Sequence, residues 1–291
     1  DKQTLLFSAT MPKGIEKIAK KNMSEAHQIA VSGRNQANRS VVHQYSLIHP
    51  RDRFDALRRW VDALPGMEGI IFCRTRAETM DIFENLRKEG YAVDLINGDL
   101  SQENRDRVMR RFHLKEVKIL VATDVAARGL DVDNLTHVIN YTLPDDLEVY
   151  VHRSGRTGRA GNQGVCVSLI SPTEEYRTRQ IERMASTKLN RVPIPTAQDV
   201  ISAQLANAIQ SLNDATLPEG HFESQIDEML GMMQGLDQRD LATKVLAVLS
   251  GELLRQYQNT EDLNQRAHAR AESRERRRNK RDRGGRERGG R

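Results

Sequence analysis

The segment 150-YVHRSGRTGRAG-161 contains three arginines and one histidine, separated by three glycines. The arginines, Arg153, Arg156 and Arg159, recur at every third position. A guanidinium group matches phosphate oxygens with paired hydrogen bonds and keeps its charge, and glycine lets the backbone approach a ligand closely. On a phosphoryl group in transfer, such arginines stabilise the charge of the transition state. We therefore predict a phosphate-binding loop; the alternative is a solvated basic loop.

The segment 119-ILVATDVAARGLDV-132 joins a strand-like apolar run to polar residues. The strand is expected to end at Thr123 and Asp124, before a short helical turn that leads to Arg128, Gly129 and Asp131. A hydroxyl and free backbone amides at the start of a helix can bind a phosphate oxygen. Asp131 is placed to accept hydrogen bonds from a sugar hydroxyl. The alternative is a helix cap with a surface ion pair.

The elements that position these residues follow a regular pattern. Strands are expected at residues 41–48, 69–73, 92–96, 118–122, 136–141 and 164–170, and amphipathic helices at 51–64, 77–89, 102–113 and 146–153. This alternation indicates an α/β fold, a parallel sheet with helices on both faces. Such sheets bind ligands beyond the carboxyl ends of their strands. Polar residues follow the strands there: Arg74-Thr75, Asn97-Gly98-Asp99 and Thr123-Asp124.

The two ends of the chain have different patterns. The N-terminal end predicts a strand at 4–7, a helix from Pro12 to Asn22, a further strand at 28–32 and a linker at 34–40. Apolar stripes at helical spacing predict three helices within 196–263. Residues 264–291 have almost no large apolar side chain and are predicted to be disordered.

The charge of the chain is concentrated in its tail. From residue 266 to the end, 11 Arg and one Lys stand against four acidic residues, a net charge of +8. Since the whole chain carries +5, the remainder carries −3. A cationic arm on a nearly neutral body indicates nucleic-acid binding that depends strongly on salt.

The composition excludes other classes of protein. The 291 residues include no run of 18 apolar residues and no secretory leader, so neither a membrane span nor secretion is expected. Cys73 and Cys166 are the only cysteines, and they lack metal-ligand spacing. Two lone thiols indicate a reducing cytoplasm and two small buried side chains. No metal site is predicted within the chain.

Five motifs in sequence order make the chain resemble the C-terminal part of a DEAD-box ATP-dependent RNA helicase. They are 5-LLFSATMP-12, 70-IIFCRT-75, 97-NGDLSQENR-105 and the two segments described above. The resemblance implies that residues 1–33 end a first RecA-like lobe and that 41–192 form a complete second lobe. More weakly, residues 196–263 resemble the bacterial cold-shock type, in which a helical segment supports dimer formation. Simple core packing is the alternative for these helices.

The resemblance also implies roles for individual residues. Arg156 and Arg159 would be arginine fingers on the ATP phosphates, Asp131 would bind the ribose, and Gly129 would lie close to the nucleotide. His152 would lie between the lobes near Ser8 and Thr10, and Arg128 would bridge toward the other lobe. RNA sugar-phosphate contacts are implied for Arg74, Thr75, Gly98, Gln102, Arg105 and Thr123. Such contacts bind RNA independently of sequence and recognise its 2′-hydroxyl. The implied Mg²⁺ that accompanies ATP would have its ligands in the first lobe.

The sequence departs from the family in three ways. Asn97 stands where His is frequent, and Ser154 stands where an aliphatic residue is usual. Neither Gly-x-x-x-x-Gly-Lys-Ser/Thr nor Asp-Glu-Ala-Asp occurs, although these motifs supply the phosphate cradle and the magnesium site. We therefore expect a truncated helicase that alone hydrolyses ATP negligibly. The alternatives are a stand-alone, non-catalytic RNA-binding and dimerising module and, less favoured by residues 97–105, a DNA translocase.

Overall fold

The computed structural model describes residues 4–7, 13–23, 27, 29, 40–127, 132, 134–159, 161–216, 228, 230–232, 235, 237–258 and 260–264. The predicted linker at 34–40, apart from Ser40, and the predicted tail at 264–291, apart from Asn264, lie outside the described residues. Most of the middle helix expected within 196–263 does so too. The chain divides into two compact units, Asp1–Leu57 with Gly66–Pro193 and Arg58–Pro65 with Ile194–Arg291.

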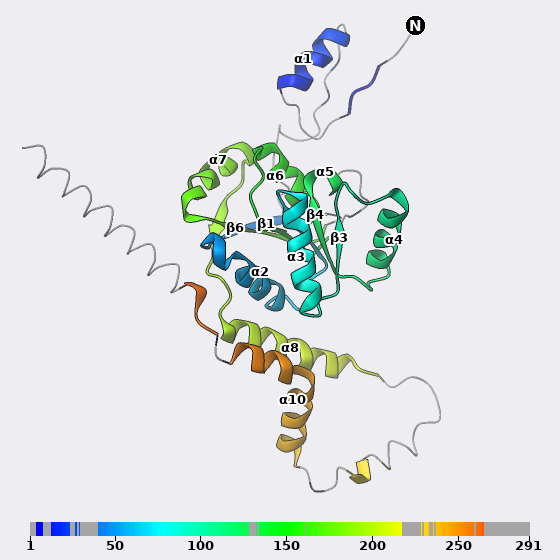
Figure 1. The fold of residues 1–291 in the computed structure, drawn as a ribbon, viewed down its shortest axis with the longest axis vertical. Coiled ribbons are helices and arrows are strands. Elements are labelled where there is room, and N and C mark those ends of the chain that lie inside the picture. The colour runs from blue at the N-terminus through cyan, green and yellow to red at the C-terminus, as the bar shows by residue number, and fades with distance from the viewer. Residues whose placement is uncertain are drawn as a thin grey trace, which may run out of the picture. The chain divides into compact units, whose positions relative to one another are not determined.

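The first unit is built on a sheet in which every pair of neighbouring strands is parallel. Its strands are β1 (Val41–Leu47), β2 (Gly69–Cys73), β3 (Val93–Ile96), β4 (Ile119–Thr123), β5 (His137–Asn140), β6 (Gly164–Ile170) and β7 (Leu189–Arg191). Their order across the sheet is β3-β4-β2-β5-β6-β1-β7. The predicted α/β fold with a parallel sheet is confirmed (Figure 1).

Helices connect the strands and cover the sheet. They are α2 (Arg53–Asp62), α3 (Arg76–Lys88), α4 (Gln102–His113), α5 (Asp124–Ala127), α6 (Leu147–Ser154) and α7 (Tyr176–Ala185), with short 3-10 helices η1 (Pro50–Asp52) and η2 (Pro172–Glu174). Helix α1 (Lys13–Asn22) precedes the first strand of the sheet. Helix α3 packs on β2, β3 and β4. Side chains of α4 to α7 instead join a buried cluster with Ile70, Phe72, Leu120 and Cys166. Helices therefore cover both faces.

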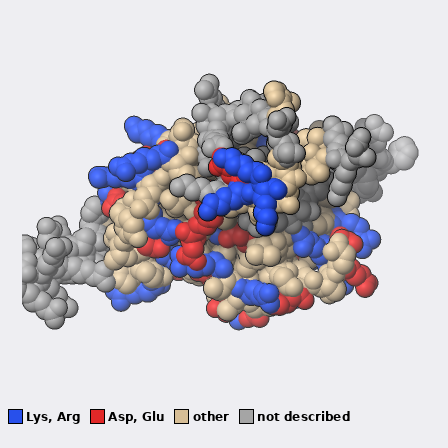
Figure 2. All heavy atoms as spheres, turned by 90° about the horizontal axis from the view of Figure 1, so that it is seen from above, with Lys and Arg blue, Asp and Glu red and all other residues tan. Residues whose placement is uncertain are grey.

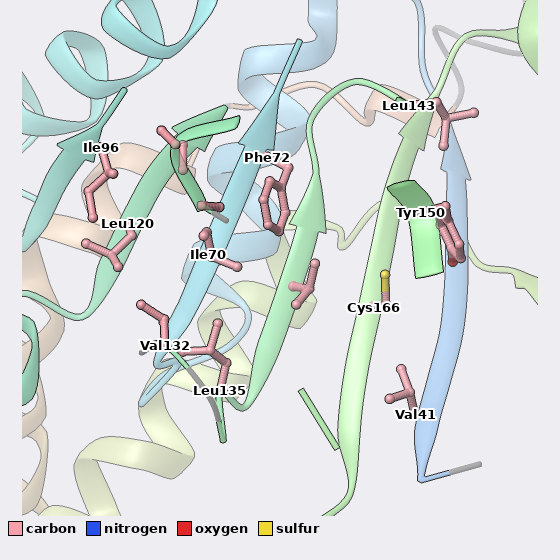
Figure 3. Packing of buried hydrophobic residues seen from close by; sticks show 14 of the residues in the cluster. Val41, Ile70, Phe72, Ile96, Leu120, Val132, Leu135, Leu143, Tyr150 and Cys166 are labelled. Atoms are coloured by element: carbon pink, nitrogen blue, oxygen red, sulfur yellow. The ribbon is translucent and has the colours of Figure 1, made fainter. Parts of the chain in front are cut away.

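The core follows from the alternation of side chains along each strand. Ile70 and Phe72 of β2 belong to the cluster under α4 to α7, whereas the alternate residues Ile71 and Cys73 are buried outside that cluster. Successive residues of a strand point to opposite faces, so a strand with both faces covered must be apolar throughout. Figure 3 shows Ile70, Ile96 and Leu120, from three neighbouring strands, on one face.

The second unit contains the C-terminal half of α2, together with α8 (Ala197–Asp214) and α10 (Gln238–Tyr257), which contact each other. Thr196 and Asp199 form a capping box that starts α8. The Arg59 guanidinium donates to the carbonyls of Pro195 and Glu261. The buried Tyr257 hydroxyl donates to the Asp62 carboxylate. Hydrogen bonds therefore link the residues that precede α8 and the end of α10 to Arg59 and Asp62, in the C-terminal half of α2.

Element boundaries agree with the sequence predictions within two residues for six of the strands, β1 to β6, but some predictions differ. Residues 4–7 form no strand, because strand pairing needs a neighbouring strand and the described residues offer them none. Helix α7 and the short edge strand β7 were not predicted. The sequence of α7, YRTRQIERMA, is mostly polar, and only Thr178, Ile181 and Ala185 are buried. No helix in the described part of the chain is long and apolar enough to cross a membrane.

Candidate functional site

Asp124 and Arg153 form a partly buried ion pair at the carboxyl end of the sheet. Asp124 follows directly on β4 and begins α5. The Nε and Nη2 atoms of Arg153 donate to its two carboxylate oxygens over 2.5 and 2.8 Å. The Arg153 side chain is 1% exposed. The prediction that Arg153 meets a ligand phosphate is therefore wrong, because its guanidinium is buried and hydrogen-bonded within the protein.

Other neighbours complete the surroundings of Arg153. Its Nη1 donates to the Asn140 side-chain oxygen over 2.9 Å and to the Thr142 carbonyl over 2.7 Å. The guanidinium carbon lies 5.0 Å from the centre of the Phe72 ring. A buried charge is tolerated only when it is paired and hydrogen-bonded. Arg153 thus fixes the end of α6 against the ends of β2, β4 and β5.

A small hollow lies beside this ion pair. Its lining comprises Phe72, Asp124, Ala127, Val149, His152, Arg153 and Arg156. The structure therefore brings together two of the predicted catalytic residues, His152 and Arg156. Arg159 is exposed and is not part of this lining; its Nε donates to the Gly155 carbonyl over 2.6 Å.

The loop that carries Arg156 is anchored on both sides. The Thr157 hydroxyl donates to the carbonyls of Leu135 and Thr136, which precede β5. Gly158 has φ +69°, and a Cβ there would stand 2.6 Å from a Val41 methyl group and 3.2 Å from the Ser40 backbone. Only glycine fits this conformation and this close approach. The loop is held where β1 begins.

Arg74 and Thr75, predicted to contact RNA, lie at the junction of β2 and α3. The Thr75 hydroxyl caps α3 by accepting from the Glu78 amide over 3.1 Å. Arg74 is 41% exposed, and its backbone amide donates to the Glu78 carboxylate. Basic and acidic side chains are interleaved on the face drawn in Figure 2. Arg74 lies within 4 Å of two carboxylates, those of Asp145 and Glu174.

Gly98, Gln102 and Arg105 follow β3, at the same edge of the sheet, because β3, β4 and β2 are neighbours. Gln102 donates to Asp106 over 2.8 Å, and Arg105 donates to the Ala126 carbonyl over 2.6 Å. Thr123 is only 8% exposed. The six predicted RNA residues therefore lie at or after the carboxyl ends of three adjacent strands, but several already have partners within the chain.

A second ion pair beside Gly98 was not predicted. Arg76 Nη1 and Asp99 Oδ1 are 2.5 Å apart, and both side chains are exposed. Neither this pair nor the Asp124–Arg153 pair leaves a signal in the sequence, since the partners are 23 and 29 residues apart. Only the folded sheet brings these partners into contact.

His43 of β1 and Tyr150 of α6 form a buried polar contact. His43 Nδ1 is 2.9 Å from the Tyr150 hydroxyl, and burial lowers the pKa of His43 to about 4. Burial likewise raises the pKa of the Cys166 thiol to about 12. Both free cysteines are buried. These groups are therefore neutral near pH 7 and belong to the core, as expected for the two thiols.

Several predicted site residues cannot be placed. Ser8, Thr10, Arg128, Gly129 and Asp131 lie outside the described residues. Within the described part of the chain, no group of three or more His, Cys, Asp or Glu side chains could hold a metal ion. No magnesium site is therefore assigned to these residues.

Known proteins resemble this chain in sequence and in fold. Residues 52–161 match the family described as the helicase conserved C-terminal domain. The DEAD-box ATP-dependent RNA helicase CshA of Geobacillus kaustophilus is 39% identical over 250 residues, which are 86% of this chain and 52% of that protein. The chain thus spans about half the length of the curated relatives that it matches.

Solved structures agree with this match. A DEAD box protein from the hyperthermophile Methanococcus jannaschii is 40% identical with a TM-score of 0.51, over 64% of this chain and 50% of that chain. S. cerevisiae Dbp5 bound to RNA and ADP BeF3 is 29% identical with a TM-score of 0.60, over 65% and 50%. The RecA-like fold is confirmed, and the chain belongs to the DEAD-box family of ATP-dependent RNA helicases, whose helicase C-terminal domain it carries.

Proposed function

We propose that this chain is the second lobe and C-terminal extension of an ATP-dependent RNA helicase. ATP and RNA would bind between two lobes, closure would separate a short duplex locally, and hydrolysis would release the RNA. The observation that carries this proposal is the hollow where Arg156 and His152 meet Asp124 at the carboxyl edge of the sheet. Cations at that edge are suited to a ligand phosphate.

The residues present fit one side of an ATP site. Arg156 and Arg159 supply positive charge for the phosphates, while the phosphate cradle and a magnesium site would belong to the first lobe. Asp131 and Gly129 remain proposed nucleotide contacts, and Ser8, Thr10, His152 and Arg128 remain proposed contacts between the lobes. Because the arginines reach the phosphates only on closure, hydrolysis depends on both ligands holding the lobes together.

RNA binding is proposed along the ends of β2, β3 and β4. Arg74, Thr75, Gly98, Gln102, Arg105 and Thr123 would contact its sugar-phosphate backbone, which carries no sequence information. The yeast relative bound to RNA and ADP BeF3 supports this choice of ligands.

The remaining regions have proposed supporting roles. The tail from residue 265 would add affinity for RNA. The helical segment would form a homodimer, supported by the exposure of Ile209, Leu212 and Val248, at 49%, 46% and 85%. The two thiols favour a cytoplasmic protein. The alternative function, an RNA-binding and dimerising module without catalysis, uses the same surfaces but not Arg156.

RNA-stimulated ATP turnover by the two-lobed protein tests the proposal. Arg156→Ala should lower turnover by about a thousandfold or more, the effect of losing an arginine finger. Arg110→Ala removes an exposed arginine in the last turn of α4, away from the hollow, and serves as the matched control. Equal turnover in the two variants would refute the role of Arg156. Turnover by the 291-residue chain alone, expected to be negligible, would contradict the need for a first lobe.

A further inference from the structure

Glu174 lies among three arginines beside the edge proposed to bind RNA. It ends the 3-10 helix η2, which follows β6. Its carboxylate oxygens are 3.8 Å from Arg53 Nη2, 3.6 Å from Arg74 Nη2 and 3.7 Å from Arg177 Nη1. One negative charge thus has three positive neighbours, one of which is a proposed RNA contact.

Two of the three arginines are nearly buried and hold Glu174 in place. The Arg53 and Arg177 side chains are each 11% exposed. Arg177 Nη2 also donates to the carbonyls of Pro144 and Asp145, and Arg53 lies over the Tyr141 ring at 5.6 Å. Moving the carboxylate away would leave two buried charges without their counter-charge, which is costly. Glu174 is therefore a fixed charge.

Arg74 is the accessible member of the group. Its side chain is 41% exposed, and its Nη2 donates to the Leu143 carbonyl over 3.2 Å. Its Nε lies 3.4 Å from the carboxylate of Asp145, which is 79% exposed. Arg74 thus stands between two carboxylates, that of Glu174, which is 29% exposed, and that of Asp145, which is solvated. Its contact with Glu174, like those of Arg53 and Arg177, is longer than a good hydrogen bond. An incoming phosphate would have to compete with both carboxylates.

We propose that Glu174, assisted by Asp145, is a built-in competitor for the RNA phosphate at Arg74. This inference rests on the proposed function, in which Arg74 contacts RNA. A fixed carboxylate beside the phosphate position weakens RNA binding, because it neutralises the arginine and repels the phosphate. The two carboxylates of Glu174 and Asp145 therefore keep the affinity for RNA below what the arginines alone would give. They favour release of the RNA after each round of ATP hydrolysis.

The test is RNA binding by the complete 291-residue chain, with the tail constant in every variant. The probe is a fluorescein-labelled single-stranded oligouridylate of about ten nucleotides, within the usual range for one single-strand site. Binding is measured by anisotropy over a series of salt concentrations. The variants are Glu174→Gln, Asp145→Asn, Arg74→Ala and Glu174→Gln with Arg74→Ala. Glu116→Gln, which removes an exposed acid paired with Arg111, controls for net charge.

Glu174→Gln and Asp145→Asn should each tighten binding by about two- to fivefold at low salt relative to Glu116→Gln, the range expected for one partly exposed ion pair. The salt slope should steepen by up to about 0.7 for one extra phosphate contact. When Glu174→Gln is combined with Arg74→Ala, neither the tighter binding nor the steeper salt slope should appear. Asp145→Asn leaves the buried arginines paired, so it keeps the test decisive if Glu174→Gln folds poorly.

The binding test distinguishes failure of the proposed contact between Arg74 and RNA from failure of the competitor role. If Arg74→Ala binds RNA as tightly as the parent chain, the proposed contact between Arg74 and RNA is wrong. If Arg74→Ala weakens binding but both acid variants behave like Glu116→Gln or bind more weakly, the competitor role is wrong and the carboxylates only position Arg74.

Discussion

Replacing Asp124 by alanine should destabilise the first unit far more than loss of an exposed charge does. The variant leaves the Arg153 guanidinium buried with only the neutral oxygens of Asn140 and Thr142 as acceptors. Breaking a fully buried pair costs about 3–5 kcal/mol. Since the Asp124 side chain is 26% exposed, water can partly replace it, and we expect about 2–3 kcal/mol.

Urea denaturation followed by circular dichroism measures this loss. The matched control is Glu116→Ala, which removes an acid from an ion pair whose side chains are 46% and 55% exposed. It should cost below about 1 kcal/mol. In a thermal melt, Asp124→Ala should lower the midpoint by about 5–10 °C for a domain of this size.

Two further variants separate charge from geometry. Arg153→Lys keeps the positive charge but cannot match both carboxylate oxygens in the observed side-on arrangement, so it should be nearly as unstable as Asp124→Ala. A double-mutant cycle between Asp124→Ala and Arg153→Met should give a coupling of about 2 kcal/mol. A cost for Asp124→Ala equal to that of Glu116→Ala, or full stability of Arg153→Lys, would refute the assignment of Arg153 as a buried anchor.

Three other predictions use different measurements. Because the pKa of His43 is about 4 in the folded chain and about 6.5 unfolded, the unfolded state binds the proton first, and the free energy of unfolding should fall by about 2 kcal/mol between pH 7 and pH 5. His43→Gln should lose that part of the pH dependence; an unchanged pH profile would contradict it. Deleting residues 265–291 should flatten the salt dependence of RNA binding, and an equal slope with and without the tail would exclude its role. Sedimentation of the chain should show a dimer whose population rises with concentration, and a monomer at all concentrations would remove the dimer proposal.

The sheet could be predicted because two of its interior strands, β2 and β4, are buried on both faces. Runs such as Ile119–Thr123 and Gly69–Cys73 are buried throughout, so composition alone marks them, and their alternation with helices predicts parallel pairing. The edge where ligands bind then follows from the direction of the strands. Helix α7 escaped prediction because only three of its side chains are buried, which leaves a weak apolar stripe.

The partners of individual site residues could not be predicted. The spacing alone does not distinguish Arg153 from Arg156, since both lie in one glycine-spaced series, although the family resemblance implies a phosphate contact only for Arg156 and Arg159. The distinction arises from the end of α6: Arg153 is in its last turn and faces the sheet, whereas Arg156 follows Gly155, which caps the helix. Likewise, Glu174 and Arg74 are 100 residues apart in sequence, and only the adjacent loops bring them together.

The buried arginine and the proposed catalytic arginine are physically connected. Arg156 lies between two fixed points, the Arg153 ion pair on one side and the Thr157 hydrogen bonds on the other. A group held in this way needs little rearrangement when charge develops on a phosphate, and such preorganisation is a main source of electrostatic catalysis. Weakening the anchor should therefore slow hydrolysis in the two-lobed protein even where the fold survives. On the proposed function, the spacing of the arginines serves two purposes: Arg153 fixes the loop, and Arg156 would be presented to the ligand.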